Sequence, residues 1–115
     1  MKYALLIYEK ADYRESVSSE AWEKMMGEHT AFWEKYGSTK VVGGDALDAH
    51  HTATSLRNRG GDYQVTDGPF VETREILGGF YIAECANLDE AIAIAREIPV
   101  EEGEGIEIRP VITGE

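Results

Sequence analysis

The chain of 115 residues predicts a single α+β domain. Three observations lead to this prediction: short apolar runs typical of strands, two stretches with apolar residues at helical spacing, and glycine pairs between polar segments. Their order along the chain is strand, helix, strand, hairpin, strand, helix, strand. This is the order of two βαβ-like halves with an inserted hairpin, which is typical of a ferredoxin-like domain with both helices on one side of an antiparallel sheet.

The first half begins with the apolar run Tyr3–Tyr8, which predicts a central strand covered on both faces. A helix is expected to begin at Ser18 or Ser19, where a hydroxyl group can cap its first turn. Gly37 is expected to end this helix in the left-handed conformation. Seven residues on or beside one face of the helix follow at its spacing: Trp22, Met25, Met26, His29, Phe32, Trp33 and Tyr36.

The middle of the chain predicts an exposed hairpin. A brief strand at Val41–Val42 is followed by two polar strand candidates, residues 52–58 and 63–66. Gly60-Gly61 lies between them, and glycines tolerate the positive φ angles of a tight hairpin turn. The sequence Asp67-Gly68-Pro69-Phe70 then breaks the strand, because Pro69 lacks an amide donor.

The second half repeats the strand–helix–strand order. Residues 80–83 predict a second central strand, and Asn87-Leu-Asp-Glu90 is a capping box that begins a second helix. Pro99 is expected to stop that helix. The alternation over residues 106–112 predicts a final strand, placed at a sheet edge by Pro110.

Composition excludes several classes of function. The chain has 11 Lys and Arg against 22 Asp and Glu, a net charge of −11, which disfavours direct binding to nucleic acid. With 43% hydrophobic and 10% aromatic residues it can form a core, and no apolar run is long enough for a signal peptide or a membrane span. The single Cys85 makes no internal disulfide, packs as a small apolar group and fits a reducing cytoplasm.

Two helices can cover only one face of the expected sheet. The other face also carries apolar residues of the runs at 3–8 and 80–83. We therefore expect a second copy of the chain to bury that face, which makes the protein a homodimer.

Two residues are candidates for catalysis. His29 lies within an otherwise apolar helix face, where an imidazole can act as a general acid or base. The alternative is a buried histidine that only satisfies a hydrogen bond. Asp67 lies at the end of a strand before a rigid turn, from which a side chain can reach a cleft, but aspartate in this position is also a common turn former.

Other polar groups give weaker signals. Residues 45–51 contain two aspartates and two histidines without a recurring ligand spacing, so a polar loop is favoured over a metal site. Arg57, Arg59 and Arg74 either attract an anionic ligand or solvate a strand face. Signatures of serine hydrolases, NTPases and dinucleotide-binding enzymes are absent from the sequence, and no cofactor is expected.

Several motifs resemble the YCII-related family in its DGPF-domain branch. They are Asp67-Gly-Pro-Phe70, Glu72-Thr-Arg-Glu75, Leu77-Gly-Gly-Phe-Tyr81, Leu88-Asp-Glu-Ala91 and Glu107-Ile-Arg-Pro110. The resemblance covers nearly the whole chain. It implies a ferredoxin-like fold that pairs into a dimeric α/β barrel, in agreement with the order of elements.

The resemblance also implies a site around a histidine of the first helix, a position that His29 matches. Smaller YCII-like proteins have a proposed His–Asp pair, with the aspartate near the end of the same helix. Residues 36–39 contain no acid here, so Asp67 is the candidate to replace it. DGPF-type domains are also associated with alternative sigma factors, which implies a regulatory alternative.

The leading hypothesis is a cytoplasmic homodimer that binds a small organic molecule between the first helix and the sheet. In it, His29 shuttles a proton and Asp67 orients it, a lyase- or isomerase-like reaction without a cofactor. The residues expected to contact the ligand are Trp33, Phe70, Glu72 and Arg74. The alternative is a non-catalytic module whose acidic surface docks on a sigma factor, with His29 structural.

Overall fold

The computed structural model describes residues 1–112 of the chain. Its main sheet has the strand order β2-β5-β1-β6, and every pair of neighbours is antiparallel. The strands are β1 (Lys2–Lys10), β2 (Val41–Ala46), β5 (Glu75–Glu84) and β6 (Gly105–Pro110). This arrangement confirms an α+β fold and is compatible with the ferredoxin-like pattern.

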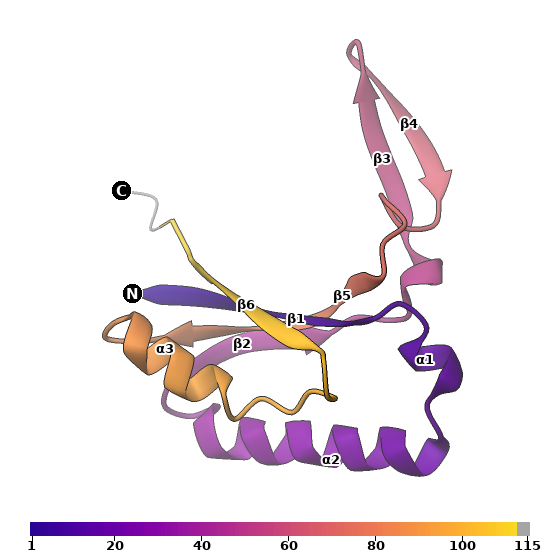
Figure 1. Ribbon diagram of the computed structural model, residues 1–115. Helices are drawn as coiled ribbons and strands as arrows, with labels where there is room; N and C mark the ends of the chain where they lie inside the picture. The colour runs from indigo at the N-terminus through magenta and orange to yellow at the C-terminus, as the bar shows by residue number, and fades with distance from the viewer. Residues whose placement is uncertain (113–115) are drawn as a thin grey trace.

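Both long helices lie on the same side of the main sheet (Figure 1). They are α2 (Ser19–Tyr36) and α3 (Leu88–Ala95), and a short helix, α1 (Tyr13–Ser16), leads into α2. Capping confirms the predicted starts, because the Ser18 hydroxyl accepts the amide of Ala21 and the Asn87 side chain accepts the amide of Glu90. Within residues 1–112, no helix is long and apolar enough to cross a membrane.

The hydrophobic core lies between the sheet and these helices. Leu5 of β1 and Val41 of β2 are almost completely buried, and Phe32 of α2 packs against them from the helix layer. Alternation along β1 directs its odd-numbered residues to this core. Cys85 is also buried in it, which confirms its expected role as a small apolar group.

The first long helix differs from its prediction in two ways. The side chains that it buries are Met25 and Phe32, whereas Trp22 and His29 are only partly buried, because both line a cavity. Gly37 is right-handed, with φ −66°. A Cβ atom at Gly37 would lie 2.6 Å from the carbonyl oxygen of Trp33, so close packing explains this glycine better than the expected left-handed angle.

Several other elements differ from expectation in extent, among them β2, α3 and β6, which cover residues 41–46, 88–95 and 105–110. Strand β5 is longer than residues 80–83, since its pairing with β1 continues through the glycines to Glu75. A short 3-10 helix, η1 (His50–Thr52), includes residue 52, where a strand was expected to begin, and the strand itself begins at Thr54. Helix α1 was not predicted, since four residues are too short for a periodic signal.

The predicted hairpin is present as a separate two-stranded ribbon, residues 54–67. It consists of β3 (Thr54–Arg59) and β4 (Asp62–Asp67), joined by Gly60 at φ 64° and Gly61 at φ 98°. Figure 1 shows the ribbon projecting away from the main sheet on the side opposite the helices. Only Ser55 within the two strands is even partly buried, which confirms that the hairpin is exposed.

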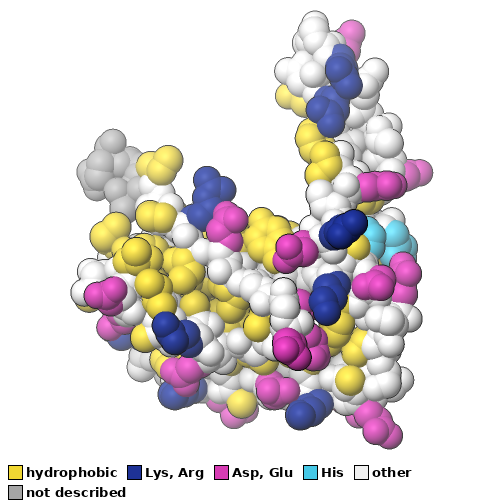
Figure 2. Space-filling view, viewed as in Figure 1, with side chains coloured by type: hydrophobic (Ala, Val, Ile, Leu, Met, Phe, Trp, Pro, Cys, Tyr) yellow, Lys and Arg dark blue, Asp and Glu magenta, His cyan; other side chains and the backbone are white. Residues whose placement is uncertain are grey.

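The face of the main sheet opposite the helices carries apolar side chains without a covering layer in the chain. By the alternation and register of the strands, the apolar side chains of this open face belong to seven residues: Ala4, Leu6, Tyr8, Val42, Leu77, Phe80 and Ile82. Figure 2 shows hydrophobic side chains beside a recess between the main body and the ribbon.

Candidate active site

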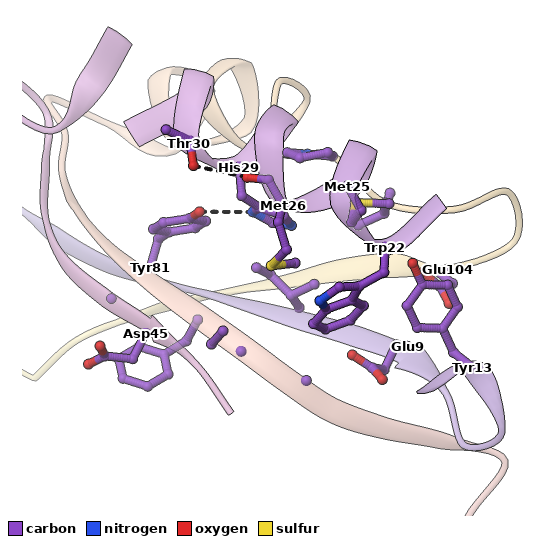
Figure 3. A pocket seen from close by; sticks show the side chains of 18 of the residues that line it. Glu9, Tyr13, Trp22, Met25, Met26, His29, Thr30, Asp45, Tyr81 and Glu104 are labelled. Carbon is purple, nitrogen blue, oxygen red and sulfur yellow. Dashed lines mark hydrogen bonds between the residues drawn. The ribbon is translucent and has the colours of Figure 1, made fainter. Parts of the chain in front are cut away.

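A cavity of about 390 Å³ lies between α2 and the helix side of the sheet, and we call it the α2 cavity. Such a volume suits a small organic molecule, because ligand pockets usually begin at about 300 Å³. Its walls are mainly apolar, with the aromatic and sulfur-containing side chains of Trp22, Met25, Met26 and Trp33 on the helix side. Two polar groups of residues lie at opposite ends of this lining (Figure 3).

His29 and Tyr81 form the first polar group. His29 Nδ1 lies 2.9 Å from the Tyr81 hydroxyl oxygen, so the two side chains share a hydrogen bond between α2 and β5. Their rings are also stacked, with centroids 6.0 Å apart. Within residues 1–112, Nε2 of His29 makes no hydrogen bond. The ring is therefore held at one nitrogen and free at the other, as a proton-exchanging group requires.

Burial shifts the protonation of both partners in this pair. It lowers the pKa of His29 below its ordinary value, against a smaller opposing effect of the Glu28 carboxylate. Burial also raises the pKa of the Tyr81 hydroxyl. Both groups are therefore uncharged at neutral pH, which is the state in which a histidine can accept a proton.

The low pKa of His29 predicts a specific pH dependence of stability. Between its folded pKa and its ordinary value of about 6.5, the unfolded chain binds more protons at this residue than the folded chain. The free energy of unfolding is therefore expected to fall as pH decreases through that window, and to fall less in His29→Gln. Urea unfolding of both proteins between about pH 5 and 8 measures the difference. Equal slopes for the two proteins would contradict a buried neutral His29.

Glu9 and Arg14 form the second polar group. Arg14 Nη2 donates to Glu9 Oε1 at 3.0 Å, and Nη1 donates to the carbonyl oxygen of Leu47 at 2.8 Å. Nε lies 3.0 Å from Glu9 Oε2, close enough for an ion pair but not aligned for a hydrogen bond. The guanidinium also lies 5.0 Å from the ring centre of Trp22. A buried carboxylate is thus neutralised at one end of the cavity.

The structure brings together only part of the predicted site. His29 and Trp33 line the α2 cavity, whereas Asp67 and Glu72 line a second hollow together with His50 and His51. The expected contact between His29 and Asp67 is absent within the described part of the chain, because Asp67 ends a strand of the projecting ribbon rather than of the main sheet. Tyr81 occupies the position beside His29 that was expected for Asp67.

The remaining predicted contacts lie outside the α2 cavity. Phe70 is exposed, and the guanidinium carbon of Arg57 lies 4.1 Å from the centre of its ring. Arg74 uses its carbonyl oxygen to accept the amide of Ala11. Among residues 1–112, no three His, Cys, Asp or Glu side chains are grouped to hold a metal ion.

Comparison with known proteins shows the family of the chain. The family model of the YCII-related domain matches residues 1–114. The chain belongs to the YCII-related domain family. A relative from Rhizobium meliloti (strain 1021), named as an uncharacterised protein, is 39% identical over 99 residues, which are 85% of this chain and 80% of the relative. The predicted YCII resemblance is therefore confirmed.

Three lining residues of this YCII-related chain were missed as site residues in the sequence: Glu9, Arg14 and Tyr81. Glu9 continues the alternation of Tyr3, Leu5 and Ile7, which face the core, and this is a detectable signal for an inward carboxylate. Tyr81 lies on β5 next to Phe80, and the same alternation of side chains directs it to the opposite face of the sheet, toward α2. No local pattern identifies Arg14, since it lies in a helix of four residues.

Proposed function

We propose that this chain binds a small organic molecule in the α2 cavity and that His29 exchanges a proton with it. One observation carries the proposal. His29 lines an apolar cavity with Nδ1 held by the Tyr81 hydroxyl, while Nε2 has no hydrogen-bond partner within residues 1–112. A structural histidine that only satisfied a hydrogen bond would not need to adjoin a cavity large enough for a ligand.

The geometry suits general acid–base catalysis. With the proton on Nδ1 donated to the Tyr81 oxygen, Nε2 carries the lone pair and can accept a proton from the ligand. The imidazolium can then return that proton to another atom of the same ligand. Such a transfer needs no cofactor and is the basis of isomerase- and lyase-like reactions, with Tyr81 as the residue that orients the imidazole.

Binding of p-cresol tests the ligand site, because this molecule combines an apolar ring with one hydrogen-bonding group. Ligand-observed NMR is expected to show saturable binding to the wild-type chain. His29→Gln is expected to weaken it about tenfold, the loss of roughly one hydrogen bond. Glu28→Gln, a change of the adjacent exposed residue, is the control and should leave binding unchanged. Absence of binding to the wild-type chain would contradict the site.

The proposal includes a homodimer in which a second copy covers the open face. The register of the ribbon supports this, because paired residues share a face of a two-stranded sheet. Leu56 pairs with Val65, and Asn58 pairs with Tyr63, so the exposed apolar side chains of the ribbon share one face, while Arg57 pairs with Gln64 on the other. In Figure 2 hydrophobic side chains of the ribbon border the recess above the main body.

Charge favours a second copy over a basic partner in this recess. The ribbon contains two arginines and two aspartates, so it has no net charge, although the whole chain has −11. It is therefore the part of the chain that an acidic second copy can approach with least repulsion. A two-stranded ribbon is also only marginally stable alone, so contact with a partner would support it.

Sedimentation velocity tests the dimer with a matched pair of variants. The wild-type chain is expected to be dimeric at micromolar concentration. Val65→Asp, on the apolar face of the ribbon, is expected to weaken association at least tenfold, because it would bury an unpaired charge. Gln64→Asp adds the same charge to the adjacent residue on the polar face and should remain a dimer. A monomeric wild-type chain, or two variants with equal association, would contradict the proposal.

A further inference from the structure

We infer that the α2 cavity selects uncharged ligands with an apolar or aromatic body and excludes both anions and cations of the same shape. The inference rests on the ligand-binding function proposed above and names the class of ligand. Three observations carry it: the contacts that Arg14 already makes, the contacts that the carboxylates of the lining already make, and the neutral polar atoms that have no hydrogen bond.

The positively charged group in the lining, the Arg14 guanidinium, already makes hydrogen bonds and an ion pair within the protein. Among the described residues that line the cavity, Arg14 is the only lysine or arginine. Its Nη1 donates to Leu47, its Nη2 donates to Glu9 and to the carbonyl oxygen of Gly78, and Nε faces Glu9 Oε2. A ligand carboxylate or phosphate would therefore find no free cation, and its burial without a partner is unfavourable.

The carboxylates of the lining are also occupied or directed elsewhere. Both oxygens of Glu104 accept backbone amides, from Lys10 at 3.1 Å and from Glu101 at 3.1 Å. Glu9 is paired with Arg14. Asp45 is exposed and pairs with Phe80 in the sheet, and in Figure 3 its carboxylate points away from His29 and Tyr81. A ligand ammonium group would therefore meet no carboxylate oxygen that is both free of a hydrogen bond and directed into the cavity.

Several neutral polar groups of the lining remain available to a ligand, and two of them carry the argument. One is His29 Nε2, which has no hydrogen bond within residues 1–112. The other is the Tyr13 hydroxyl, which is buried without a hydrogen-bond partner in the same part of the chain. Figure 3 shows Tyr13 and His29 toward opposite ends of the cavity, with Trp22 and Met26 between them. This arrangement fits an apolar body with an uncharged hydrogen-bonding group at one or both ends.

A series of probes with one shape and three charges tests this inference. We would measure binding of 4-methylbenzamide, 4-methylbenzoate and 4-methylbenzylammonium to the full chain at neutral pH by ligand-observed NMR, with p-cresol as reference. The amide is expected to bind at least tenfold more tightly than either ion. If benzoate or the ammonium ion binds as tightly as the amide while p-cresol also binds, the charge selection is wrong but the ligand site stands. If no probe binds, the proposed function itself fails, and this inference with it.

A variant of Glu9 is expected to reverse the selection against anions. Glu9→Gln keeps the shape of the side chain but removes the charge that neutralises Arg14, so 4-methylbenzoate is expected to gain at least tenfold in affinity over the wild-type chain. No gain in a variant with a wild-type circular dichroism spectrum would contradict the role given to the ion pair. If the variant does not fold, the three probes on the wild-type chain still decide the inference.

Discussion

Arg14→Ala is expected to lower the free energy of unfolding by about 3–5 kcal/mol, because it leaves the Glu9 carboxylate buried without its partner. The two side chains are only 15% and 10% exposed, so water cannot readily replace the lost contacts. The variant also loses the hydrogen bonds that tie α1 to Leu47 and Gly78. Urea unfolding followed by circular dichroism measures the effect.

Two further variants show whether the loss of stability comes from leaving a buried charge unpaired rather than from removing an ion pair as such. Lys35→Ala removes an ion pair with Glu97 whose side chains are 60% and 42% exposed, and it should change stability by less than about 1 kcal/mol. The double variant Glu9→Leu/Arg14→Leu should recover much of the loss, since neither buried charge remains. Equal effects of Arg14→Ala and Lys35→Ala would show that the Glu9 site is open to water.

Gly44→Ala is expected to destabilise the fold by about 3 kcal/mol, through backbone strain and overlap with β5. Gly44 has φ 146°, in the region that side chains rarely adopt. A Cβ atom there would overlap the carbonyl oxygen of Phe80 and lie 2.8 Å from both the Cα and the ring of Tyr81. The change should therefore also displace the partner of His29, and thermal unfolding together with p-cresol binding measures both effects.

The adjacent glycine provides the control for this prediction. A Cβ atom at Gly43 meets nothing within 4 Å, and its φ lies outside the region that favours glycine. Gly43→Ala should change stability by no more than about 1 kcal/mol, in either direction. Comparable losses in the two variants would indicate that β2 tolerates no side chain at all, rather than that Gly44 packs against Tyr81.

Local patterns predicted most of the elements because their physical causes are local. The apolar run of β1, the capping residues Ser18 and Asn87, and the glycine pair of the hairpin turn each act within a few residues of the chain. The edge position of β6 was also predictable, since Pro110 cannot donate a ladder hydrogen bond.

The candidate site was harder to predict because its contacts are distant in sequence. His29 was identified from its position on α2, but its partner Tyr81 is 52 residues away on β5. The direction of the ribbon, which separates Asp67 from His29, depends on the connections to the main sheet rather than on the strand pattern. Glu9 was overlooked because an acid at the end of an apolar run is usually exposed, whereas here the ion pair with Arg14 makes its burial tolerable.

The most direct test of the α2 cavity is a long-range ¹H–¹⁵N NMR spectrum of the ¹⁵N-labelled chain during titration with p-cresol. The chain has three histidines, and comparison with His29→Gln assigns the His29 signals. His29 lines the α2 cavity, whereas His50 and His51 line the second hollow. We expect the ring nitrogens of His29 to shift and saturate while those of His50 and His51 stay unchanged. Saturable shifts at His50 or His51 without a change at His29 would contradict the account.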